Sequence, residues 1–218
     1  MLERRVAQSL LAVGVLAWLA VQGVLVGVPL RERAAPPEAD DAYVYILKSV
    51  QMASCFFQDC PALEDLRGPL KAPAPSVEGT WQRYRAYTRC FLVYHPLYSA
   101  VLLALHSVGA SWEQAYKLIW ASGPLLFGLA FAYWLTVFWG AAQAGLALLW
   151  LSVQVFPGQG LHYVTPTNLS LVLAAVYWGR IAAARGAVPW TLPLGALALV
   201  AMHPTGRIYA VAGVAVGV

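Results

Sequence analysis

Charge is scarce in this sequence, and one long part of it has no acidic residue. Only 11% of the 218 residues are charged and 60% are hydrophobic, whereas about 25% are charged in a typical soluble domain. No aspartate or glutamate occurs between Gln114 and Val218. A soluble domain of this size could not hide so much apolar surface, but a bilayer could, because its interior is apolar. The composition therefore predicts an integral membrane protein.

Several patterns that mark other functions are also missing. The sequence has no C-x-x-C redox motif, and no close pairing of histidine with cysteine that would suggest a metal site with three or four ligands. The net charge of +4 comes without a basic stripe interleaved with aromatic residues, so nucleic acid is not an expected partner. The positive balance instead favours contact with anionic membrane lipid.

The charged residues that are present gather in one segment. Of the ten carboxylates, eight lie between Arg31 and Cys90, with eight of the fourteen lysines and arginines. Before this segment, Val6–Leu30 is free of charge for 25 residues, enough to cross about 30 Å of hydrocarbon. A cleaved signal peptide usually has an apolar region of only about 7–15 residues, so we expect a retained span. Arg4 and Arg5 place the N-terminus in the cytoplasm and the charged loop outside.

This outer loop has features of its own. We expect a helix from Asp40 to Gln58, ended by Pro61, with an apolar face made of Val44, Leu47, Val50 and Met52. An oxidising exterior permits a disulfide. With three cysteines one thiol stays unpaired, and the two pairings that we consider are Cys55–Cys60 and Cys60–Cys90.

The next apolar segment, Phe91–Ala110, could span the membrane or lie along its outer surface. If it spans, Arg180 and Arg185 fall outside, against the tendency of basic residues to stay inside. If it does not span, Ala115–Phe138 runs inward and both arginines lie inside. We therefore expect an interfacial helix at Phe91–Ala110, followed by a capping box at Ser111-Trp112-Glu113-Gln114 that opens the next span.

The remaining segments follow from this choice. We expect an inner turn at Trp139–Gly145, an outward span at Leu146–Phe156, an outer loop at Pro157–Asn168 and a returning helix at Leu169–Trp178. The final apolar helix, Ile208–Val218, has eleven residues, too few to cross, which indicates a fragment.

The expected fold is therefore all-α: a polytopic transmembrane helical bundle with a long extracytoplasmic first loop that contains interfacial helices. Residues 1–30 are the cytoplasmic N-terminus and first transmembrane helix. Residues 31–114 are the extracytoplasmic loop with juxtamembrane helices, and residues 115–218 are further transmembrane helices, the last one truncated.

Two adjacent carboxylates, Asp40 and Asp41, are the candidates for chemistry near the outer end of the first span. One of such a pair can have a raised pKa or share a divalent cation, and a carboxylate can take the proton from an attacking hydroxyl. The alternative is that Asp40 caps the following helix and Asp41 favours its N-terminal dipole.

Basic and polar residues of the outer side are the candidates for substrate binding. Arginines at positions 83, 85, 89 and 207 could hold a phosphate by bidentate hydrogen bonds, or they could form an interfacial belt on lipid headgroups. The histidines could bind phosphate or metal, or simply line a cavity. The full set of candidates is Arg83, Arg85, Arg89, His95, Tyr98, His162, Asn168, His203 and Arg207.

The order of these features resembles the N-terminal half of the GT-C superfamily of membrane glycosyltransferases, which use polyprenyl-phosphate sugar donors. The similarity rests on the acidic stretch Glu38-Ala39-Asp40-Asp41-Ala42-Tyr43 after the first span, and on His95-Pro96-Leu97-Tyr98 late in the loop. A span, a tight inner turn and a second span follow, and the resemblance covers about residues 6–210.

The resemblance implies that an aspartate of the first outer loop is the catalytic base or helps to hold a divalent cation, with Asp40 ahead of Asp41. It implies an extracytoplasmic active side, a polyprenyl-phosphate sugar as donor and an acceptor that the sequence does not identify. The second outer loop, Thr165-Pro166-Thr167-Asn168, has no acid where some members carry one. That departure keeps two alternatives open: a non-catalytic membrane subunit or scaffold with this fold, and a transporter.

Overall fold

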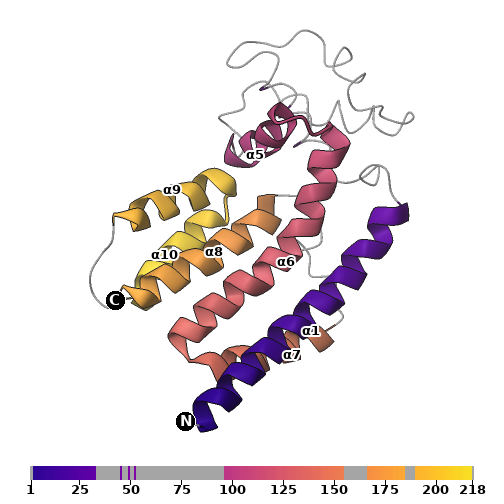
Figure 1. Cartoon of the computed structure of the whole chain (residues 1–218). Helices are drawn as coiled ribbons and strands as arrows, with labels where there is room; N and C mark the ends of the chain where they lie inside the picture. Colours follow the sequence, from indigo (N-terminus) through magenta and orange to yellow (C-terminus); the bar gives the residue numbers. More distant parts are fainter. Residues whose placement is uncertain are drawn as a thin grey trace.

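The computed structural model describes residues 2–32, 96–154, 166–184 and 190–217, together with Tyr45, Ser49 and Met52. The longer described stretches form helices and contain no strand, as the sequence predicts. The helices (Figure 1) are α1 (Leu2–Glu32), α5 (Pro96–Ser107), α6 (Trp112–Phe138), α7 (Ala141–Val153), α8 (Pro166–Ala183), α9 (Thr191–Met202) and α10 (Gly206–Gly217).

Two of these helices are long and apolar enough to cross a membrane. They are the segment Leu2–Gly27 within α1 and the segment Gln114–Phe138 within α6. The helices α5, α7 and α9 are apolar but shorter. With 13 residues, α7 is about 20 Å long at a rise of about 1.5 Å per residue, less than the thickness of the hydrocarbon core.

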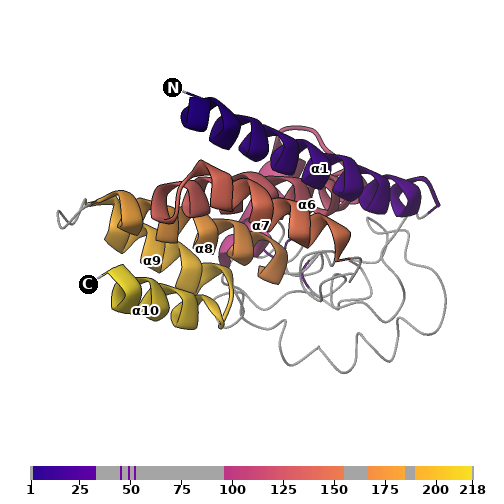
Figure 2. The same ribbon diagram turned by 90° about the horizontal axis from the view of Figure 1, so that it is seen from below.

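The helices follow one another across the molecule in a layered order, from α1 through α6 and α7 to α8 and then to α9 and α10 (Figure 2). Glycines allow the closest crossings. A Cβ added to Gly14 of α1 would overlap the backbone of Gly145 in α7, and one added to Gly179 of α8 would overlap Tyr133 of α6. Small residues at helix crossings are typical of helix packing in membranes.

The contacts also give the relative directions of α1, α6 and α8. Trp18 of α1 donates a hydrogen bond from its indole Nε1 to the carbonyl oxygen of Pro124 in α6, at 2.9 Å. Towards the N-terminus of α1, Leu11 belongs with Phe131 of α6 to one apolar cluster, so α1 and α6 run antiparallel. Gly123 meets Asn168 and Trp134 meets Gly179, so α6 and α8 run parallel.

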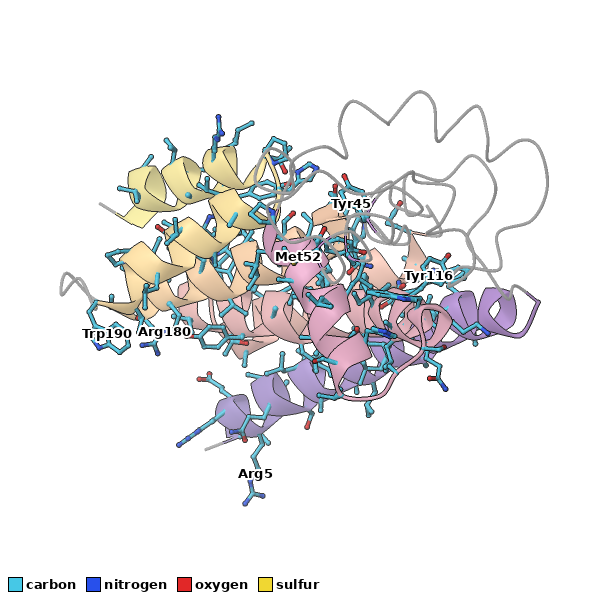
Figure 3. The ribbon with its side chains drawn as sticks, turned by 90° about the horizontal axis from the view of Figure 1, so that it is seen from above. Arg5, Tyr45, Met52, Tyr116, Arg180 and Trp190 are labelled. Carbon is cyan, nitrogen blue, oxygen red and sulfur yellow. The ribbon has the colours of Figure 1, made fainter. Side chains whose placement is uncertain are left out.

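The bundle consequently has two distinct ends. At the first, which we call the α5 end, α5 packs against the start of α6, the start of α8 and the end of α9. This cluster holds Tyr98, Leu102, Tyr116, Leu169 and Met202. At the second, which we call the Arg5 end, lie the N-terminus of α1 and the C-terminal part of α8 with Arg180 (Figure 3).

The start of α6 has the capping box that the sequence predicts. Ser111 is the N-cap, its hydroxyl accepts a hydrogen bond from the Gln114 backbone N–H at 3.1 Å, and the Ser111 N–H donates to Gln114 Oε1 at 2.8 Å. The predicted capping box is therefore confirmed.

Several predicted boundaries are wrong: among them, α7 ends at Val153 and not at Phe156, and α8 continues past Trp178 to Ala183. The turn expected at Trp139–Gly145 is confined to Trp139 and Gly140, and α7 begins at Ala141, because Gly140 alone supplies the positive φ of 103° that reverses the chain. Asn168, expected in a loop, lies in the first turn of α8. Pro166 explains this start, since proline is well suited to the first position of a helix.

The helix expected from Asp40 to Gln58 is described at three residues only. Tyr45, Ser49 and Met52 are all helical and buried, and Ser49 Oγ donates to the Tyr45 carbonyl at 2.7 Å, as in a helical turn. Met52 belonged to the predicted apolar face, whereas Tyr45 and Ser49 did not. The other members of that face lie outside the described residues.

Candidate functional site

Four predicted site residues fall in the described part of the chain, and all four lie at the α5 end. Tyr98 is on α5, Asn168 on the first turn of α8, His203 in the turn between α9 and α10, and Arg207 on the first turn of α10. Seven other predicted site residues lie outside the described residues: Asp40, Asp41, Arg83, Arg85, Arg89, His95 and His162.

His203 connects three elements of this end. Its Nε2 lies 3.4 Å from Thr167 Oγ1 on α8. On the other side of the ring, Nδ1 lies 2.6 Å from Thr205 Oγ1 and accepts the Thr205 backbone N–H at 3.2 Å. Partial burial lowers the pKa of His203 below its ordinary value of 6.5, because desolvation disfavours the imidazolium ion. The neutral ring is therefore the favoured form at neutral pH.

Arg207 follows closely on α10 and its side chain is exposed. The turn that carries it is held by two backbone hydrogen bonds, from Gly206 to the His203 carbonyl at 2.8 Å and from Arg207 to the Pro204 carbonyl at 3.2 Å. The turn thus keeps a guanidinium within a few residues of a neutral imidazole. Together they offer N–H donors suited to phosphate oxygens.

Asn168 is fully buried beside α6. Its amide occupies the space that a side chain at position 123 would need, because Gly123 of α6 has no Cβ. The residue is thus held at the α6–α8 crossing, next to Thr167. This placement makes it a packing residue, and it brings the Thr167 hydroxyl to His203.

Tyr98 is also completely buried. Its ring meets the ring of Tyr45 edge to face, with centroids 5.2 Å apart and planes at 78°. Figure 3 shows Tyr45 and Met52 over α5, at the same end as Tyr116. Tyr98 therefore joins α5 to the helical residue Tyr45, in a structural position within the core of this end.

Some residues that were not predicted as site residues also have buried or polar contacts. Thr167 and Thr205 hold His203; the signal of Thr205 was a hydroxyl two positions from the histidine, whereas Thr167, 36 positions away, gave none. Gln22 of α1 is 4% exposed although it sits in a long apolar helix. Its signal was clearer, because a polar residue inside a transmembrane segment usually has a specific role.

The described residues contain no group of three or more histidine, cysteine or acidic side chains that could hold a metal ion. The pair Asp40 and Asp41, which we consider for a divalent cation, lies outside them.

A separate apolar cavity of about 210 Å³ opens between α6, α8 and α10, lined by Trp134, Phe138, Trp178 and neighbouring residues. Its lining suits hydrocarbon, and the polar residues of the α5 end do not contribute to it.

Comparison with known proteins finds no matching family model, no matching curated protein and no matching solved structure.

Proposed function

We propose that the chain is a polytopic membrane protein with a cytoplasmic N-terminus and an extracytoplasmic active side at the α5 end. Basic residues support this orientation, since Arg4, Arg5 and Arg180 all belong to the Arg5 end and basic residues favour the cytoplasmic side. Trp139 and Trp190, which are 60% and 76% exposed, lie in the turns of that same end, where aromatic residues are expected to meet the membrane surface.

On its outer side, the protein transfers a sugar from a polyprenyl-phosphate donor to an acceptor hydroxyl. The observation that carries this proposal is the position of α5. It packs on the ends of α6, α8 and α9 and does not extend along the bundle. The acidic outer loop and the turn with His203 and Arg207 then share one side of the membrane, as the resemblance to GT-C glycosyltransferases requires.

Each group has a defined part in this reaction. Asp40, or Asp41 in its place, takes the proton of the acceptor hydroxyl while the acceptor oxygen forms a bond to the anomeric carbon. The bond between that carbon and the phosphate oxygen breaks, and the polyprenyl phosphate leaves with the electron pair. Arg207 and His203 stabilise the charge that develops on the departing phosphate.

The test is sugar transfer by the purified full-length protein with a panel of synthetic polyprenyl-phosphate hexoses, measured as released polyprenyl phosphate. We expect Asp40→Asn to lose at least a hundredfold in rate, on the order of general-base catalysis, with unchanged thermal unfolding. Asp65→Asn, in the same loop, is the matched control and should keep full activity. Full activity in both Asp40→Asn and Asp41→Asn would end the proposal.

A transporter is the second candidate, and the buried polar side chain of Gln22 in α1 favours it. Polar residues inside the membrane often line a substrate path. Reconstituted vesicles separate the two functions. Uptake of a sugar or lipid-linked sugar without cleavage of the phosphate bond would support transport, whereas release of polyprenyl phosphate by the protein alone would support transfer and exclude a non-catalytic subunit.

A further inference from the structure

The backbone of the α9–α10 turn determines which nitrogen of His203 carries the proton. The Thr205 backbone N–H is 3.2 Å from Nδ1, and an N–H group can only donate. Nδ1 must therefore present its lone pair, and in the neutral ring the proton sits on Nε2. The Thr205 hydroxyl, 2.6 Å from the same Nδ1, donates to it as well.

The protonated Nε2 then points to the start of α8. Thr167 Oγ1, at 3.4 Å, is at the long limit of a hydrogen bond, so this contact is weak. By contrast, the two contacts on Nδ1 are made by a single residue two positions along the chain. Through its backbone N–H and its hydroxyl, Thr205 therefore contributes both to the orientation of the ring and to its tautomer.

We propose that Thr205 is a positioning residue for His203. It locks the imidazole in the Nε2–H form with this donor directed to the α8 start, where it meets a phosphate oxygen of the donor substrate. The inference rests on the proposed function for the identity of that substrate. Its structural part, the tautomer and orientation of His203, stands on the distances of the turn.

Loss of the Thr205 hydroxyl should change the pKa of His203 in a defined direction. A hydrogen bond donated to Nδ1 stabilises the neutral ring, so its removal raises the pKa of His203. The other titratable or charged side chains on the described helices around this turn, α5, α8 and α10, are Tyr98, His106, Tyr177, Arg180, Arg207 and Tyr209, and α9 itself has none. They are unchanged by substitutions at position 205.

The experiment compares Thr205→Val, which removes only the hydroxyl, with Thr205→Ser, which keeps it. Nitrogen-15 spectra of the histidine-labelled full-length protein distinguish protonated from unprotonated ring nitrogens, with His203→Gln assigning the signal among the four histidines. We expect the Nε2–H form in all three proteins, because the backbone N–H at position 205 remains, and a raised His203 pKa in Thr205→Val alone. With a polyprenyl-phosphate hexose as donor, kcat/KM should fall about fivefold in Thr205→Val, the size of one lost hydrogen bond, and recover in Thr205→Ser.

The outcomes separate the two claims. An Nδ1–H tautomer in the wild type, or the same His203 pKa and the same rates for the valine and serine variants, would overturn the positioning role. The expected spectra together with no sugar transfer by any variant would overturn the proposed function while supporting the orientation of His203. If Thr205→Val does not fold, Thr205→Ala makes the same comparison.

Discussion

At Gly123, the neighbouring Asn168 occupies the space that a side chain would need. A Cβ at this position would overlap the Asn168 amide. We expect Gly123→Ala to destabilise the protein by about 1–3 kcal/mol, the usual cost of overpacking. Thermal unfolding in detergent measures the effect.

Gly23 of α1 provides the matched control, since a Cβ there meets nothing within 4 Å. Gly23→Ala should leave stability unchanged or raise it by about 0.5–1 kcal/mol, because alanine is the better helix former. Equal effects at the two glycines would contradict the α6–α8 crossing described above.

His203 makes stability depend on pH through its lowered pKa. The folded pKa is below the ordinary value of 6.5 that applies to the unfolded chain, so the unfolded state binds more protons as the pH falls. The stabilisation is therefore complete above about pH 6.5 and is lost as the pH falls towards the folded pKa. Thermal unfolding between pH 8 and 5 should show a larger loss for the wild type than for His203→Gln. Parallel curves for the two proteins would contradict this assignment.

At the scale of a helix, the capping box gives a prediction with a known magnitude. Ser111→Ala removes the acceptor of the Gln114 N–H and should cost about 1 kcal/mol. Ser111→Asp keeps an acceptor in place and should retain the stability. A stable Ser111→Ala protein would mean that packing of Trp112 and Tyr116, and not the cap, determines where α6 begins.

The elements that could be predicted from the sequence are those whose signal lies in the segment itself. A serine followed three residues later by glutamine predicted the start of α6, and a long charge-free run predicted α1. The predicted boundary was wrong where the start of a helix depends on one backbone angle, as at Gly140, or on a proline at its first position, as at Pro166. The same limit applies to the site, because only the fold brings Thr167 beside His203, 36 positions away.

At the scale of the whole molecule, the proposed function requires that the two ends of the bundle face opposite sides of a membrane. The best labelling positions are exposed and free of backbone strain. Val108, after α5, is 82% exposed and Trp139 is 60% exposed, whereas Gly109 and Gly140 have positive φ angles that a cysteine would adopt only with strain.

In a background where Cys55, Cys60 and Cys90 are replaced by serine, we expect a membrane-impermeant maleimide to label Val108→Cys in intact cells. Trp139→Cys should react only after the membrane is opened, because the turn between α6 and α7 belongs to the end that we propose to be cytoplasmic. The reverse pattern would place the N-terminus outside. It would also separate the acidic loop from the extracellular donor lipid, so the glycosyltransferase proposal would lose its topological support while the helical packing described here would remain intact.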